Sequence, residues 1–344
     1  MKRLFTVVAL ALTAVLLALP AAANAGGPAC SPRTLATFPA ADYGSFLESM
    51  AMDSHGTLFC SVTTWADSNT GQLWQVTPNG KARVVATLDL TAYGQLMGVA
   101  IDPCDRVYVA VADNSSINGV PDSIGSGVYV LRGNSLLKVA VLPSGSFPNG
   151  MAFHDGRLCI TDSYNGCVWR VAPGGGLACQ ATRWLSDRLL QPAGNEYLGV
   201  DGIAFLGDQL YLTNWSKHTI LRSSLAGSGS PGRLRVAYDS PDLYSADGLA
   251  FDALGDLWIT TDGIQGPLPS GGLSYLTPSG RLVTVAKDPG WLNYPTMPVF
   301  GTSPATRHTL FICNGAFWSG YGDGTVPGIQ ALTVPVTGLP SWLW

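Results

Sequence analysis

The segment FPNGMAFHDGRLCITDS (147–163) contains a short apolar strand, a D-G turn, a second apolar strand and an acidic residue at its end. Apolar and polar residues alternate with period two, which is typical of strands that bury one face. The same outline occurs six times in the chain. The copies are SMAMDSHGTLFCSV (49–62), GVAIDPCDRVYVAV (98–111), GMAFHDGRLCITD (150–162), GIAFLGDQLYLTN (202–214), GLAFDALGDLWITT (248–261) and MPVFGTSPATRHTLFICN (297–314).

The copies begin 49, 52, 52, 46 and 49 residues apart, and a second hairpin follows each one. Two of these hairpins turn at T-P-N-G (77–80) and T-P-S-G (277–280), which suit tight turns. Four short strands in each repeat of this length predict a propeller blade. We therefore expect an all-β fold, a six-bladed β-propeller with four-stranded blades, over residues 26–344 as a single domain. The residues from Cys30 to Phe38 are expected to supply an N-terminal strand that closes the ring.

The first 25 residues resemble a secretory signal peptide. Lys2 and Arg3 precede an apolar run, and Ala23-Asn24-Ala25 has the small-x-small pattern of a cleavage site. The apolar run is shorter than the roughly 20 residues of a membrane span. We expect a secreted or periplasmic protein with no membrane partner. The full chain has a formal net charge of −4, and loss of Lys2 and Arg3 with the signal peptide gives the mature chain a charge of −6.

Several classes of function lack support in the composition. Charged residues make up 12% of the chain, and no cluster of Lys and Arg is present, so a nucleic-acid partner is not expected. There is no G-x-S-x-G elbow of a serine hydrolase and no H-E-x-x-H of a zinc protease. A small-molecule substrate is the partner that we expect.

The sequence contains seven cysteines, an odd number that leaves at least one thiol unpaired in an exported protein. Cys159 and Cys167 flank a tight turn, so they could face each other across a hairpin. The alternative is that these residues are buried thiols that pack as small apolar groups.

The residue before each first strand changes from blade to blade. These six positions hold Glu48, Met97, Asn149, Asp201, Asp247 and Thr296. Because the first strand of a blade lies nearest the propeller axis, three carboxylates and one amide would converge there and repel one another. Glu48, Asn149, Asp201 and Asp247 thus form a candidate site for one divalent metal ion: Ca²⁺ first, with Mg²⁺, Mn²⁺ or Zn²⁺ as alternatives. The other interpretation is that they only cap strands and turns.

A second polar set follows the second strands, which end on the same face of the ring. Asp162, Asn214 and Asn314 share one offset, and Asp262 falls one residue later. Together with Asn149, these four residues are candidates for contacts to substrate hydroxyls. Turn chemistry explains them equally well.

The order of several motifs resembles the SMP-30/gluconolactonase family of sugar lactone lactonases. The matching segments are ESMAMD (48–53), PNGMAF (148–153), ADGLAFDALGDLWIT (246–260), TMPVFG (296–301), HTLFICNGAF (308–317) and VPGIQALTVPVTGLP (326–340). The chain departs from the family at Asp201, where Asn is usual, and it has no clear equivalent of the family's substrate-binding Arg.

The resemblance implies a six-bladed propeller with one divalent metal on its axis. It implies that Glu48, Asp201 and Asp247 bind the metal, with Asn149 as a fourth ligand or a substrate contact. The expected function is an exported metal-dependent hydrolase of lactones or related esters, with Asp247 or Asp201 as the catalytic general base. The alternative is a non-catalytic propeller that binds a ligand or protein partner and holds a structural axial ion.

Overall fold

A computed structural model describes residues 32–38, 45–64, 70–90, 94–115, 124–173, 179–264, 271–287, 290–317 and 326–339 of the chain. Residues 31–344 form one compact unit. The expected signal peptide and Cys30 lie outside the described residues, and the signal peptide stays a prediction.

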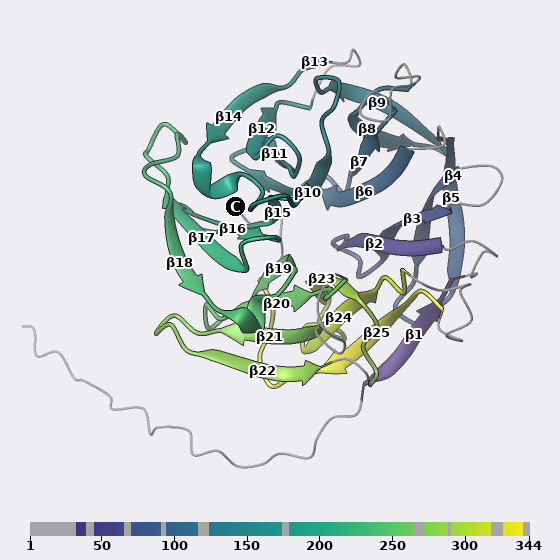
Figure 1. Ribbon diagram of the computed structural model, residues 1–344. Coiled ribbons are helices and arrows are strands. Elements are labelled where there is room, and N and C mark those ends of the chain that lie inside the picture. The colour runs from purple at the N-terminus through teal and green to yellow at the C-terminus, as the bar shows by residue number, and fades with distance from the viewer. Residues whose placement is uncertain are drawn as a thin grey trace, which may run out of the picture. The chain divides into compact units, whose positions relative to one another are not determined.

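The described strands form six antiparallel blades arranged in a ring, as predicted (Figure 1). Within a blade the strands follow one another from the axis outward. The first three blades contain β2 (Ser45–Met52), β3 (Leu58–Thr64), β4 (Thr70–Val76) and β5 (Ala82–Asp89); β6 (Gly94–Ile101), β7 (Val107–Asp113), β8 (Gly127–Arg132) and β9 (Ser135–Val141); and β10 (Pro148–His154), β11 (Arg157–Asp162), β12 (Cys167–Val171) and β14 (Thr182–Ser186).

The last three blades follow the same plan. They contain β15 (Val200–Leu206), β16 (Gln209–Asn214), β17 (Thr219–Ser224) and β18 (Arg235–Asp239); β19 (Ala246–Phe251), β20 (Leu257–Thr261), β21 (Gly272–Leu276) and β22 (Leu282–Lys287); and β23 (Pro295–Phe300), β24 (Thr309–Asn314), β25 (Gly328–Thr333) and β1 (Arg33–Thr37). Two short 3₁₀ helices, η2 (Arg188–Leu190) and η3 (Pro241–Leu243), precede the inner strands of blades 4 and 5. A two-residue strand, β13 (Cys179–Gln180), pairs in parallel with β9 and adds a fifth strand to blade 2.

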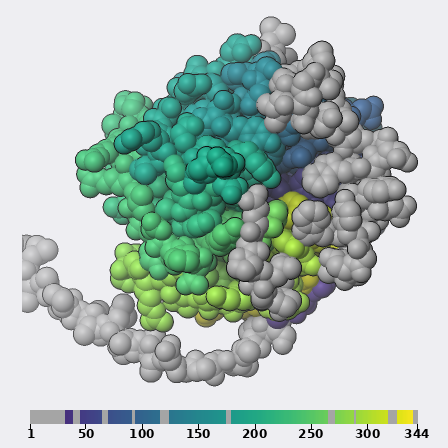
Figure 2. All heavy atoms as spheres, viewed as in Figure 1, coloured from purple at the N-terminus to yellow at the C-terminus, as the bar shows by residue number. Residues whose placement is uncertain are grey.

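The N-terminal strand closes the ring. β1 pairs antiparallel with β25, so the outermost strand of blade 6 comes from the opposite end of the propeller sequence. In Figure 2, purple N-terminal residues accordingly lie next to yellow C-terminal ones. Backbone hydrogen bonds between these two strands join the first and last parts of the fold, as the sequence predicted.

Aspartates shape the turns between first and second strands. Asp102 Oδ1 accepts hydrogen bonds from the backbone N–H groups of Cys104 and Arg106, at 2.9 and 3.0 Å. Asp252 Oδ1 makes the same two bonds to Leu254 and Asp256, at 2.9 and 3.0 Å. The short carboxylate side chain thus satisfies turn N–H groups that no strand can pair, which explains why the turn motif repeats.

Small residues on the inner strands pack against large residues of the next blade. Ala152 of β10 packs with Ile203 and Phe205 of β15, and Ala204 packs with Leu249 and Phe251 of β19. The alanine leaves room for the following inner strand to approach closely.

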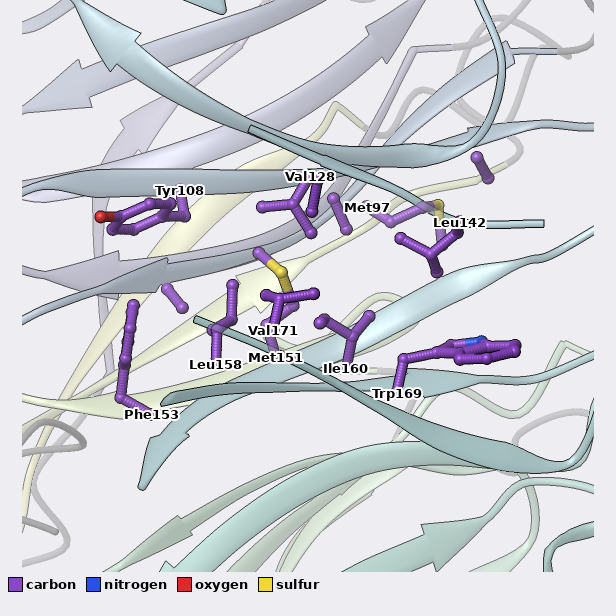
Figure 3. Close-up of a cluster of buried hydrophobic side chains, with 14 of the residues drawn as sticks. Met97, Tyr108, Val128, Leu142, Met151, Phe153, Leu158, Ile160, Trp169 and Val171 are labelled. Atoms are coloured by element: carbon purple, nitrogen blue, oxygen red, sulfur yellow. The ribbon is translucent and has the colours of Figure 1, made fainter. Parts of the chain in front are cut away.

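Figure 3 shows the equivalent contact between blades 2 and 3, where Met97 and Tyr108 lie opposite Met151 and Phe153. The rings of Tyr108 and Phe153 meet edge to face, with centroids 5.3 Å apart. Such aromatic contacts add to the free energy of apolar burial between the blades.

All six cysteines within the described residues are free thiols. In the hairpin of β11 and β12, Cys159 lies opposite Arg170 and Cys167 lies opposite Asp162. The first of the two alternatives, that these cysteines face each other, is therefore wrong, because the turn is centred between Tyr164 and Asn165, later in the chain than that pairing requires. Among the described residues, no helix has the length and apolar character needed to cross a membrane.

Candidate functional site

A β-bulge interrupts the inner strand of every blade at the same place. The register of the first and second strands shifts between Leu47 and Ser49 in blade 1 and between Val200 and Ile203 in blade 4, with equivalent shifts elsewhere. The bulges contain the six residues that the sequence placed before the strands. That placement is wrong by a few residues, because the strands begin earlier. A bulge redirects a side chain out of the normal alternation.

Glycine after the bulge allows neighbouring blades to approach one another. A Cβ at Gly202 would lie 2.2 Å from the backbone oxygen of Asp247, and one at Gly98 would lie 2.1 Å from that of Asn149. Thr213 Oγ1 then accepts from Gly202 N–H at 2.6 Å and donates to the Asp247 oxygen at 2.9 Å. At these glycines an added Cβ would force the neighbouring backbone to shift, so glycine is what lets adjacent bulges approach this closely.

The four candidate metal ligands of the sequence line a single cavity of about 20 Å³ on the axis: Glu48, Asn149, Asp201 and Asp247. The volume is about that needed for one water-sized species. All four side chains are buried. The structure therefore brings together, from four different blades, the residues that the repeat register singled out.

The carboxyl groups around this cavity hold protons more tightly than ordinary carboxyls. Burial, followed by the negative charge of Asp262, raises the pKa of Glu48 from 4.5 to about 8. Burial raises the pKa values of Asp201 and Asp247 well above their usual range, and the charges of their carboxyl neighbours raise them further. Asp201 and Asp247 can share a hydrogen bond when one of them holds its proton. The cluster is a group of acids whose full ionisation requires a compensating positive charge.

Asp262 adds a fourth carboxyl to this group, and it lies outside the bulges. Its Oδ1 accepts from Ile264 N–H at 3.0 Å, and its Oδ2 accepts from the Trp215 indole at 2.9 Å. Burial raises the pKa of Asp262 to about 6, although these hydrogen bonds oppose the rise. The sequence placed Asp262 in the substrate-binding set; its charge acts on Glu48, Asp201 and Asp247.

Asp162 has its hydrogen-bond partners within its own blade. Its Oδ1 accepts from the N–H groups of Phe147 and Asn165 at 3.0 and 3.1 Å. Its Oδ2 accepts from the Trp169 indole at 2.8 Å. These bonds fix the turn between β11 and β12, which is the turn chemistry that the sequence left as the alternative. Contact with a substrate stays a prediction for this residue.

Asn214 and Asn314 are likewise engaged in loops. The Asn214 amide donates to the Gln191 carbonyl at 3.1 Å and fixes the segment after η2. Asn314 accepts from Asn293 N–H at 3.1 Å and donates to the Trp291 carbonyl at 2.9 Å. Neither residue lines the axial cavity. A substrate contact for either one stays a prediction.

The donors around the axial cavity fit a hard divalent cation. Asp201 Oδ1 is buried and has no hydrogen-bond partner among the described residues. The Asn149 amide nitrogen donates to Ser163 Oγ at 3.3 Å, a bond that does not use the amide oxygen. Carboxylate and amide oxygens are the ligands that such ions take. Within the described part of the chain, however, no three His, Cys, Asp or Glu side chains stand in a preformed metal-binding arrangement.

No family model matches this chain, and no curated protein matches it in sequence. Solved structures do match. Regucalcin, a calcium-binding protein of Agrobacterium tumefaciens, is 18% identical with a TM-score of 0.62, and the match covers 90% of this chain and 96% of regucalcin. A gluconolactonase of Xanthomonas campestris is 16% identical with a TM-score of 0.59, covering 89% of this chain and 90% of its own.

The PQQ-bound aldose sugar dehydrogenase of Streptomyces coelicolor is also similar. It is 15% identical with a TM-score of 0.53, covering 89% of this chain and 99% of its own. These three proteins differ in what they bind or catalyse, so the shared architecture leaves the chemistry open. At these identities the likeness shows the fold, a β-propeller of the kind found in regucalcin and gluconolactonase.

Proposed function

We propose that this protein is an exported, metal-dependent hydrolase of lactones or related esters. The observation that carries the proposal is the convergence of Glu48, Asn149, Asp201 and Asp247 on one axial cavity. Three acids with raised pKa values in one buried place are costly to the fold, and such groups are typical of functional sites. The structural likeness to a gluconolactonase agrees with this assignment.

Glu48, Asn149, Asp201 and Asp247 would hold the divalent ion, with Ca²⁺ as the first expectation. A bound ion would supply Lewis acidity, which polarises a carbonyl. Asp247, or alternatively Asp201, would take a proton from water as the water oxygen adds to the ester carbon. The ring C–O bond then breaks, and the leaving oxygen receives a proton, so that lactone and water give a hydroxy acid.

The hydrogen bond between Asp201 and Asp247 suits a division of roles. Two carboxyls this close ionise at different pH values, so one can serve as a charged ligand while its neighbour exchanges a proton. Asp262, whose charge acts on Asp247 and which accepts a hydrogen bond from Trp215, would orient a substrate hydroxyl.

The alternative is a propeller without catalytic activity that holds a structural ion and binds a ligand or protein. The burial of all four ligand side chains and the small size of the cavity favour this second function. An enclosed ion could not offer a coordination position to a substrate.

A hydrolysis screen with the mature chain separates the two functions. The protein is stripped with a chelator and then supplied with Ca²⁺, Mg²⁺, Mn²⁺ or Zn²⁺ before aldonolactones, homoserine lactones and aryl esters are tested. Hydrolysis that is lost on chelation and restored by one ion supports the enzyme. A protein that binds the ion tightly but hydrolyses none of the three classes supports the binding propeller. Export is tested separately, by following the full-length chain to the culture medium or periplasm and sequencing its N-terminus.

A further inference from the structure

An apolar channel lies on the propeller axis next to the carboxyl cluster. Three positions of each inner strand line it, at offsets of two, three and four residues from the bulge residue. The residue three positions after the bulge residue is alanine in five blades and valine in the sixth. The residue four positions after the bulge residue is phenylalanine in four blades: Phe153, Phe205, Phe251 and Phe300. Among the described residues that line this channel, none is charged.

Methionines are concentrated around this axis. The chain has six, and all five that follow Met1 lie on inner strands. Met50, Met52, Met151 and Met297 line the channel. Methionine is unbranched and adapts its shape to an apolar ligand, so it is suited to a binding surface that must accommodate different chains.

The channel and the carboxyl cavity are adjacent. Met151, Ile203 and Met297 line both of them. At the end of the channel farthest from the carboxyl groups, Leu339 also lines the channel. Its backbone N–H donates to the Phe251 carbonyl at 2.9 Å. The polar site thus continues directly into apolar space, and the C-terminal segment covers part of the other end of that space.

We propose that the channel binds a short aliphatic chain of the ligand, while the carbonyl of the same ligand lies at the carboxyl cluster. The connection to hydrolysis rests on the proposed function; binding of an apolar chain does not. The ligand class is therefore a lactone or ester with a short alkyl substituent, rather than one whose substituents are all hydroxylated. A hydroxylated substituent would leave its donors without partners among these side chains.

The size of the channel limits the length of the chain. Its volume is about 60 Å³, whereas apolar cavities that hold benzene measure about 150 Å³. By this comparison a substituent of about two carbons fits the channel as it stands, and one of up to about four carbons fits if the methionines adjust. Longer chains or aromatic rings would require the blades to separate.

The first experiment measures binding without catalysis, in protein labelled with ¹³C at the methionine methyl groups. 1-Butanol serves as the ligand because it has no ester to hydrolyse. We expect saturable shifts of the Met50, Met52, Met151 and Met297 signals. Met97 does not line the channel and is the internal reference. Absence of shifts at the four channel methionines up to the solubility limit overturns the proposal, as does an equal shift of Met97.

A channel-filling variant makes the test specific. Met52 and Ile101 occupy, in blades 1 and 2, the position four residues after the bulge residue. The double variant Met52→Phe/Ile101→Phe gives this position the phenylalanine that the other four blades have. We expect 1-butanol affinity to fall at least ten-fold. Leu137→Phe, on the exposed side of β9, is the matched control and should bind as the wild type does. If the double variant fails to fold by circular dichroism, Ile101→Phe alone is used, with at least a three-fold loss expected; unchanged affinity in the folded variant overturns the proposal.

The second experiment uses γ-lactones with alkyl substituents of one to eight carbons. We expect kcat/KM to rise about four-fold for each buried CH₂ up to about four carbons and then to fall. Butanol binding without hydrolysis of any lactone leaves the channel site standing and contradicts the hydrolase. Hydrolysis with no dependence on chain length, and no butanol binding, contradicts the channel and leaves the hydrolase standing.

Discussion

The Trp215 indole of blade 4 donates a hydrogen bond to the Asp262 carboxylate of blade 5, with 2.9 Å between Nε1 and Oδ2. This bond joins two blades beside the axial acids and stabilises the charged form of Asp262. The pKa of Asp262 accordingly rises only to about 6 despite its burial. Within the axial group of acids, Asp262 therefore ionises below neutral pH, while Glu48, whose pKa is about 8, still holds its proton.

Trp215→Phe should raise the pKa of Asp262 above 6, because the variant removes a hydrogen bond to the charged form. The shift is measured by NMR titration of the labelled carboxyl carbon. Trp184→Phe is the matched control, since its indole donates to the Gly229 carbonyl in another part of the ring. An Asp262 titration that does not change in Trp215→Phe would show that the bond has no effect on the charge.

Asp247→Asn should keep the fold and lose hydrolytic activity by about 10² to 10⁴ if Asp247 is the general base or a metal ligand. The two side chains have nearly the same size, and asparagine is equally suited to a turn. Hydrolysis rate, metal content and circular dichroism are compared with the wild type and with Asp242→Asn, whose side chain is exposed. Full activity and full metal content in Asp247→Asn would remove this residue from the site.

Without a divalent ion, the protein should lose stability as the pH rises. The pKa of Glu48 is raised from 4.5 to about 8, so the folded state binds more protons than the unfolded state in that interval. The resulting stability is complete below pH 4.5 and is lost as the pH rises through about 8, at about 1.4 kcal/mol per pH unit for one proton. Asp201 and Asp247 act in the same direction.

Urea unfolding in the presence of a chelator, between pH 5 and pH 8, measures this dependence. Glu48→Gln should reduce the slope, because one of the titrating protons is removed. Adding the ion should reverse the trend, since ionised carboxylates bind it better. A chelated protein that becomes more stable toward pH 8 would contradict the charge arrangement described for the axis.

Gly202→Ala should destabilise the fold by about 1–3 kcal/mol, which is typical of overpacking. The added Cβ would lie 2.2 Å from the Asp247 backbone oxygen, so the bulge of blade 5 must move. Gly227→Ala is the control, because no atom of the described residues lies within 4 Å of its Cβ position. Equal urea midpoints for the two variants would show that the blades do not approach as closely as described.

Thiol labelling should detect an odd number of free cysteines per chain, and individual cysteines should react at different rates. With seven cysteines, denatured and unreduced protein should show an odd number of thiols per chain. In the native protein the exposed Cys104 should react first. The buried Cys159 should react slowly, because burial raises the pKa of its thiol to about 12. An even count would indicate a disulfide between chains or a modified cysteine.

Local patterns in the sequence were sufficient for the blades and for the axial residues. Alternation with period two and turn residues such as Asp102 and Asp252 act over a few neighbours, so a single repeat contains the information for its own hairpins. Repetition then indicates the ring, and equal register indicates which residues share the axis. That reasoning grouped Glu48, Asn149, Asp201 and Asp247. In the structure these four residues, separated by as many as 199 positions, line one cavity.

The tertiary structure decided what each polar residue contacts. Asp162 and Asp262 follow equivalent strands, yet one bonds within its own turn and the other lies with the axial acids. The bulges, the pairing of Asp201 with Asp247 and the apolar channel beside them were equally beyond prediction. All of them depend on how closely one blade packs against the next, a distance set by glycine and alanine facing larger side chains around a closed ring. No single repeat contains that distance, because it exists only between blades.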